Sequence, residues 1–126
     1  MYENLTPNLM VKSVFESLKF YEEMLGFQKV LTVPETGEDL QFAILKKDNI
    51  TLMFQEQKNL IQEYPSLDCE EIKPCLTLFI TVSNVLEMYD ILKEKVQLAS
   101  ELHKTFYGKN EFAIFDNNGF ILTLAD

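Results

Sequence analysis

Apolar residues recur at helical spacing directly after Ser13, at Val14, Leu18, Tyr21 and Leu25. Ser13 and Glu16 have the spacing of a capping box, in which a hydroxyl and a carboxylate each bond the other residue's backbone. Gly26 is the residue type that most often ends a helix in the left-handed conformation. The pattern therefore predicts a helix over residues 14–25.

Short apolar runs bounded by turn-forming residues surround this helix. One run precedes it at residues 5–11. Three follow it, at 27–33, 40–46 and 50–55, separated by Pro34–Gly37 and by Lys47–Asn49. The first half of the chain is thus predicted as β-α-β-β-β.

A polar stretch over residues 57–74 follows, with a short helix predicted at 59–64, ended by Pro65, and a loop after it. The same order of elements then returns. We expect a strand at 75–82, a helix from Asn84 to about Lys95, and strands at 96–105, 110–115 and 120–124. Asn118-Gly119 is a strong hairpin signal between the last two strands.

The sequence itself repeats along with the elements. Phe42-Ala43-Ile44 returns 70 positions later as Phe112-Ala113-Ile114, and segments on either side return at offsets of 71 and 72. Such a unit cannot bury its apolar side alone. We therefore expect one domain over residues 1–126, made of modules 1–56 and 75–126 joined by linker 57–74, with any site in the cleft between the modules.

Composition narrows the functional classes. The chain has 126 residues with net charge −9 and pI near 4.6, which argues against binding a nucleic-acid backbone. No apolar run is long enough for a membrane span, and the N-terminus lacks a signal-peptide pattern, so a cytoplasmic location without membrane contact is expected. Cys69 and Cys75 are then expected to be free thiols.

The doubled β-α-β-β-β unit resembles the glyoxalase, bleomycin-resistance and extradiol-dioxygenase superfamily, also called vicinal oxygen chelate proteins. Three stretches carry the resemblance: Val11-Lys12-Ser13, the segment 17–27 with Phe20-Tyr21 before Leu25-Gly26-Phe27, and the segment 107–119 with Tyr107-Gly108. Asn117 and Asn118 depart from the family's usual Asp-Pro-Asp-Gly ending. The resemblance implies an α+β fold in which two βαβββ modules form a cupped mixed sheet.

Family enzymes hold one divalent metal in the cup, with a His, Glu or Gln ligand on the first and last strand of each module. The resemblance places these positions at Thr6, Thr51, Thr77 and Thr123. A neutral hydroxyl is a poor ligand for a divalent first-row ion. We therefore expect no metal and no cofactor. A shifted ligand set drawn from Asn8, Gln55 and His103 remains as an alternative.

The two-residue strand period puts further side chains beside the four threonines. The expected ligand-binding set joins the threonines to Asn8, Met53, Gln55 and Phe79, with His103 and Tyr107 nearby. His103 is the single histidine and a candidate general base, and Tyr107 can stack on a flat ligand. Each has a structural alternative: threonine suits strands in general, His103 fits a surface position, and Tyr107 fits packing under its loop.

These observations favour a metal-free protein that binds a small organic molecule in the cup, as bleomycin-resistance proteins do. The overall negative charge suits a cationic ligand, although the pattern places no carboxylate in the cup. Two other functions stay open: a glyoxalase-like lyase or dioxygenase with a displaced metal site, and a structural or regulatory module with a filled cup. The resemblance also implies a homodimer.

Overall fold

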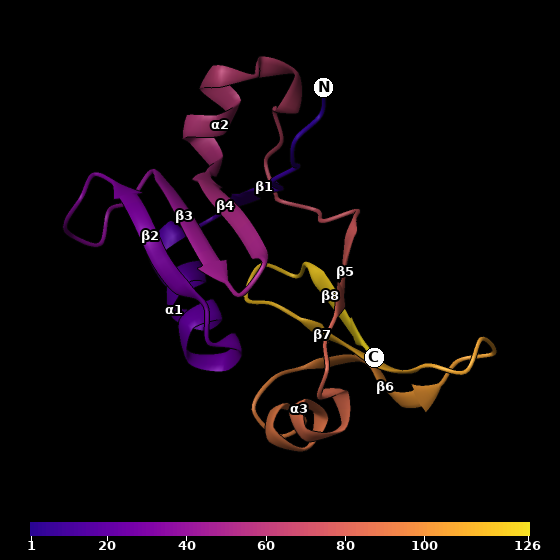
Figure 1. Cartoon of the computed structure of the whole chain (residues 1–126). Coiled ribbons are helices and arrows are strands. Elements are labelled where there is room, and N and C mark those ends of the chain that lie inside the picture. The colour runs from indigo at the N-terminus through magenta and orange to yellow at the C-terminus, as the bar shows by residue number, and fades with distance from the viewer. The chain divides into compact units, whose positions relative to one another are not determined.

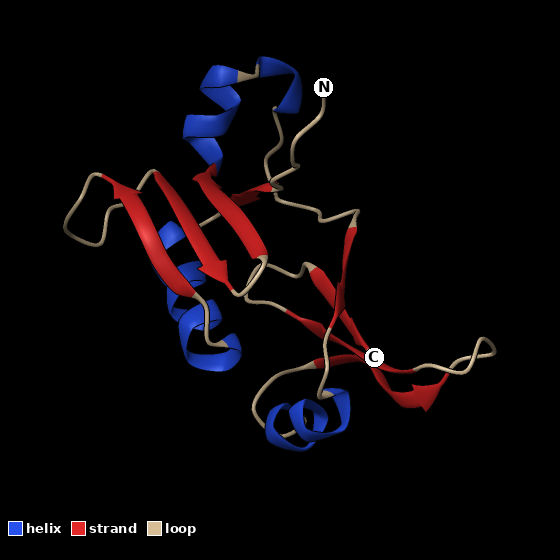
Figure 2. Ribbon diagram, in the orientation of Figure 1, coloured by secondary structure: helices blue, strands red, loops and turns tan.

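Each half of the chain forms a four-stranded mixed sheet with a helix against one face, as the computed structural model of residues 1–126 shows (Figures 1 and 2). The chain divides into two units, Met1–Ile72 and Lys73–Asp126. The division falls within the stretch predicted as a linker. Each unit has the predicted β-α-β-β-β order, and the α+β fold class is confirmed.

The first unit contains β1 (Asn8–Val11), α1 (Val14–Leu25), β2 (Gln28–Val33), β3 (Phe42–Lys47) and β4 (Ile50–Glu56). Its sheet order is β1-β4-β3-β2, with β1 parallel to β4 and the other neighbours antiparallel. All four strands lie where the hydrophobic pattern predicts them, with ends that coincide or differ by at most three residues.

Helix α1 has the predicted bounds, because both of its ends are fixed locally. The Ser13 hydroxyl accepts a hydrogen bond from the Glu16 amide at 3.1 Å, while the Glu16 carboxylate makes no return bond, so half of the capping box forms. Gly26 takes the left-handed conformation, with φ of 74°. The fully buried Tyr21 ring then packs edge-on against Phe54, with ring centroids 5.0 Å apart.

Helix α2 (Gln57–Glu63) begins two residues earlier than predicted. The reason is Glu56, whose carboxylate accepts hydrogen bonds from the Lys58 and Asn59 amides at 2.8 and 3.1 Å. Glu56 therefore acts as a helix cap. The stretch predicted as loop also contains a short 3₁₀ helix, η1 (Pro65–Leu67), which uses Pro65 at its first position.

The second unit contains β5 (Thr77–Thr81), α3 (Val85–Leu92), β6 (Leu98–Lys104), β7 (Asn110–Phe115) and β8 (Ile121–Ala125). Its sheet order is β5-β8-β7-β6, with β5 parallel to β8. Helix α3 ends at Leu92 rather than near Lys95, where turn bonds to the Leu92 carbonyl replace the helical pattern. The Asn84 side chain makes no capping bond, because its backbone ψ of 47° departs from the extended value of 114° at Ser13.

The strand pairing shows that the two repeated tripeptides are not structural counterparts. In the first unit Ala43 pairs with Phe54, on the helix-covered face, whereas in the second unit Ala113 pairs with Thr123, on the opposite face. The repeated Phe-Ala-Ile tripeptides are thus one residue out of register, and a slip of one residue exchanges the two faces of a strand. The repeat of elements is correct, but the structural counterpart of Phe112 is Ala43.

The two helix starts provide a matched test of capping. Ser13→Ala removes a side-chain bond to a helix amide and is expected to lower the free energy of unfolding by about 1 kcal/mol. Asn84→Ala removes no such bond and is expected to cost a few tenths of that value, roughly 0.3 kcal/mol. Urea unfolding of both variants measures the difference, and equal losses would contradict it.

Candidate functional site

Each sheet has one face covered by its own helix and one face opposite it, here called the open face. In the first unit β1, β3 and β4 alternate between the two. Leu9, Ala43 and Phe54 lie on the α1 side and are buried. The strand registers give the open face of the first unit these side chains: Asn8, Met10, Leu31, Val33, Phe42, Ile44, Lys46, Thr51, Met53 and Gln55.

The centre of this open face is apolar. Ile44 and Met53 face each other across β3 and β4, and both are half-buried. Leu31 continues the row onto β2 and is exposed. Thr51 lies on the same face, two residues before Met53, and Thr6 precedes β1 in a half-buried position. Three of these side chains are thus aliphatic or thioether groups able to contact the carbon skeleton of an organic molecule.

The side-chain amides of Asn8 and Gln55, which were predicted to bind a ligand, are hydrogen-bonded within the first unit. Asn8 donates to the Gln55 side-chain oxygen at 2.9 Å. Gln55, which is 7% exposed, donates to Asn59 at 2.7 Å and to Glu63 at 3.3 Å, both on α2. A buried amide needs such partners. These bonds hold α2 against one end of the sheet.

The strand-pairing register also bears on which residues occupy the positions of the family's metal ligands. Asn8 pairs with Met53 in the first unit, and Phe79 pairs with Thr123 in the second. When Asn8 and Phe79, which lie 71 positions apart, are taken as counterparts, this register makes Met53 rather than Thr51 the counterpart of Thr123. The two positions are uncharged in each unit: Thr6 and Met53 in the first, Thr77 and Thr123 in the second. Neither pair fits the divalent metal of the family's enzymes, and no three His, Cys, Asp or Glu side chains gather within either unit.

The open face of the second unit is more polar. Its strand registers assign it the following side chains: Thr77, Phe79, Thr81, Ser100, His103, Glu111, Ala113, Phe115, Ile121, Thr123 and Ala125. Opposite them, Phe112 packs edge-on against Tyr89 of α3, with ring centroids 5.2 Å apart. Of the predicted residues, Thr77, Phe79, His103 and Thr123 lie on this one face.

A carboxylate that the sequence did not single out lies on this face. Glu111 is opposite His103 in the β6–β7 pairing, with Glu111 Oε1 3.7 Å from His103 Nε2. The Tyr107 hydroxyl donates to Glu111 Oε2 at 2.9 Å. His103 and Tyr107, predicted as separate candidates, are therefore brought together by Glu111. The alternation of Glu111, Ala113 and Phe115 against Phe112 and Ile114 was the signal that assigns Glu111 to this face.

The carboxylate changes the acidity of Tyr107. Its hydrogen bond stabilises the neutral phenol, and the nearby negative charge disfavours a phenolate, so both raise the pKa of Tyr107 above its ordinary value of 10. The Glu101 carboxylate has the same effect on the pKa of Tyr89. At neutral pH Tyr107 is thus a fixed hydrogen-bond donor that orients Glu111.

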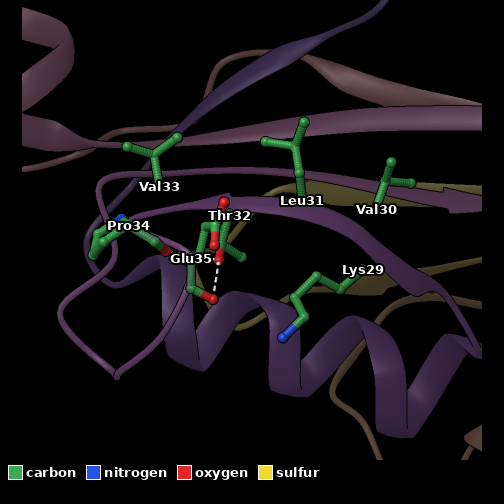
Figure 3. A pocket seen from close by; sticks show the side chains of 7 residues that line it. All are labelled: Lys29, Val30, Leu31, Thr32, Val33, Pro34 and Glu35. Carbon is green, nitrogen blue, oxygen red and sulfur yellow. Dashed lines mark hydrogen bonds between the residues drawn. The ribbon is translucent and has the colours of Figure 1, made fainter.

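A hollow of about 530 Å³ runs along β2, lined by the seven residues Lys29 to Glu35 (Figure 3). The figure shows Val30, Leu31 and Val33 projecting to one side of the strand and Lys29 to the other. A single strand and its turn supply all of these walls, so the hollow is an open groove at the sheet edge. None of the residues predicted to bind a ligand lines it.

The link between Glu111 and Tyr107 is testable by titration. The hydrogen bond persists below pH 10 and is lost as pH rises through the raised pKa of Tyr107. Glu111→Gln removes the charge and is expected to lower the pKa of Tyr107 toward 10, while Glu101→Gln acts on Tyr89 instead. Carbon-13 NMR of the tyrosine Cζ atoms resolves each residue. An unchanged titration of Tyr107 in Glu111→Gln would contradict the geometry.

Comparison with solved structures finds the same fold in many other proteins. TioX from Micromonospora sp. ML1 matches with a TM-score of 0.79 at 16% identity, covering 98% of each chain. A glyoxalase-related enzyme from Fulvimarina pelagi matches with a TM-score of 0.78 at 16% identity, covering 99% of this chain and 88% of that one. A bleomycin-binding protein from Streptomyces verticillus, in complex with copper(II)-bleomycin, matches with a TM-score of 0.66 at 16% identity, covering 98% and 95%.

At these identities the structural matches establish the fold alone. The comparison with curated protein sequences finds no match. No helix is long and apolar enough to cross a membrane. The family model for the glyoxalase/bleomycin resistance protein/dioxygenase superfamily matches residues 5–124, which is nearly the whole sequence. The chain belongs to this superfamily.

Proposed function

We propose that this protein binds a small organic molecule on the open face of a sheet and does so without a metal ion. The observation that carries the proposal is the uncharged chemistry at the positions that the family resemblance assigns to metal ligands. In the first unit these are Thr6 and Met53, and in the second unit they are Thr77 and Thr123. Uncharged groups of this kind suit hydrogen bonds and apolar contacts with an organic ligand.

The apolar surface of the first unit supports the same function. Met53 and Ile44 are only half-buried, so a ligand can remove further apolar area from water. Such burial favours binding by about 25 cal/mol per Å². The bleomycin-binding neighbour was solved with an organic ligand bound, so proteins of this fold can serve in binding.

A metal-dependent lyase or dioxygenase is less well supported by the same geometry. The displaced ligand set would draw on Asn8, Gln55 and His103. Asn8 and Gln55 bond each other, and Gln55 also bonds α2. His103 is engaged by the Glu101 carbonyl through Nδ1. Recruiting Asn8 and Gln55 to a metal requires breaking bonds that stabilise the first unit, whereas the Nδ1 bond of His103 leaves its Nε2 atom able to coordinate.

We also propose that the protein forms a homodimer, as the family resemblance implies. Strand β2 lies at the edge of its sheet, and Val30, Leu31 and Val33 on it are 43–59% exposed. An edge strand with exposed apolar side chains favours association with another chain. A second copy of this chain is the partner that we expect to cover it.

Binding is tested by titrating ¹⁵N-labelled protein with benzyl alcohol, a neutral aromatic probe. We expect saturable amide shifts on β3 and β4 around Ile44 and Met53. Met53→Gln is expected to weaken the binding about fivefold, as for roughly 1 kcal/mol of lost apolar contact. Lys19→Gln, an exposed change on the outer side of α1, is the matched control and should leave binding unchanged.

Metal analysis of the purified protein completes this test. We expect zinc, nickel, iron and manganese well below one ion per chain, with benzyl alcohol binding unaltered by a chelator. A stoichiometric metal whose removal abolishes binding would contradict the metal-free function.

The dimer is tested by light scattering coupled to size-exclusion chromatography. The expected mass is twice the chain mass of 14.7 kDa. Val33→Lys places a charge on the exposed side of β2 and should shift the protein toward the monomer. A monomeric wild-type protein at millimolar concentration would rule the dimer out.

A further inference from the structure

Glu111 lacks a strong cationic partner. Its side chain is only 16% exposed, and the sole basic group near it is His103, at 3.7 Å. No lysine forms an ion pair with it, and the chain has no arginine. Removing a carboxylate from water without a full positive partner costs free energy. The site is therefore electrostatically suited to receive a cation.

The hydrogen-bonding state of His103 points the same way. His103 Nδ1 lies 2.7 Å from the Glu101 carbonyl oxygen, which can only accept, so Nδ1 carries the hydrogen. In the neutral imidazole Nε2 then has a lone pair and no hydrogen. This lone pair is directed toward Glu111 Oε1, also an acceptor. Two acceptors facing each other at 3.7 Å favour a hydrogen-bond donor placed beside both.

Small, buried side chains flank Glu111 on this face. Ala125 pairs with Glu111 on β8, and Ala113 lies two residues further along β7 on the same face. Both side chains are single methyl groups. Beyond them, on β5, Phe79 is 60% exposed on the same open face and can contact the carbon skeleton of a ligand. Strands β6 and β7 themselves lie side by side (Figure 1).

We propose that the open face of the second unit holds a subsite for a protonated amine or amidine group of the ligand, with Glu111 as its negative partner and His103 Nε2 as a second acceptor. Tyr107 positions Glu111 by donating to Oε2. The subsite rests on the small-molecule binding proposed above and specifies the class of ligand. The net charge of −9 also attracts cations from solution.

The test compares benzylamine, benzyl alcohol and benzoate by ¹⁵N NMR titration of the full chain at pH 8. Benzylamine is expected to shift the amides of Glu111, Ala113 and Ala125 and to bind there at least fivefold more tightly than benzyl alcohol, with benzoate weakest. Glu111→Gln should abolish this difference. The Gln side chain can still accept from Tyr107 and donate to His103, so urea unfolding should show unchanged stability. Tyr107→Phe keeps the charge and should retain the preference for benzylamine.

Equal binding of benzylamine to wild type and Glu111→Gln would overturn the subsite. If the neutral probe binds the first unit but charge makes no difference in the second, the subsite fails and the proposed function stands. If no probe shifts either open face, both fail.

Discussion

Strand register is the constraint on which the rest of this structure depends. Side chains alternate between the two faces of a sheet, so a shift of one residue moves a whole strand's chemistry from the core to the open face. In β7 the observed register buries Phe112 and Ile114 against α3 and leaves Glu111 on the other side. With the alternative register the carboxylate would face the core, where an unpaired charge is costly.

Hydrophobic periodicity and local turn chemistry were sufficient to predict most of the fold. Ser13 and Gly26 fix both ends of α1 through bonds within a few residues, and such signals are visible in a sequence. The end of α3 has no glycine, and the start of α2 depends on a glutamate cap, so those boundaries were shifted. The repeat was recognised from short similar segments of sequence. Such segments alone do not give the register of strand pairing, because the register depends on the lengths of the hairpin loops. The two-residue turn between β3 and β4 differs from the longer loop between β7 and β8.

The candidate site could be predicted only in part for the same reason. Thr123, Phe79 and His103 share one open face as strand alternation suggests. Glu111 was missed because its relation to His103 and Tyr107 arises from cross-strand pairing and from the path of the β6–β7 loop. Asn8 and Gln55 were predicted to bind a ligand, yet their side chains bond each other, and Gln55 also bonds α2. A helix that follows a strand can engage polar groups that a strand pattern alone leaves unpaired.

The two open faces differ in chemistry although the units share one topology. The first is mainly aliphatic and thioether, and the second combines a carboxylate, an imidazole and a phenol. The most direct measurement is a crystal structure of the protein as purified. We expect Glu111 on the face opposite α3 within reach of Tyr107 and His103, and no metal ion bound at Thr6 and Met53 or at Thr77 and Thr123. A transition-metal ion bound at any of these residues, or Glu111 packed on the α3 side, would contradict this expectation.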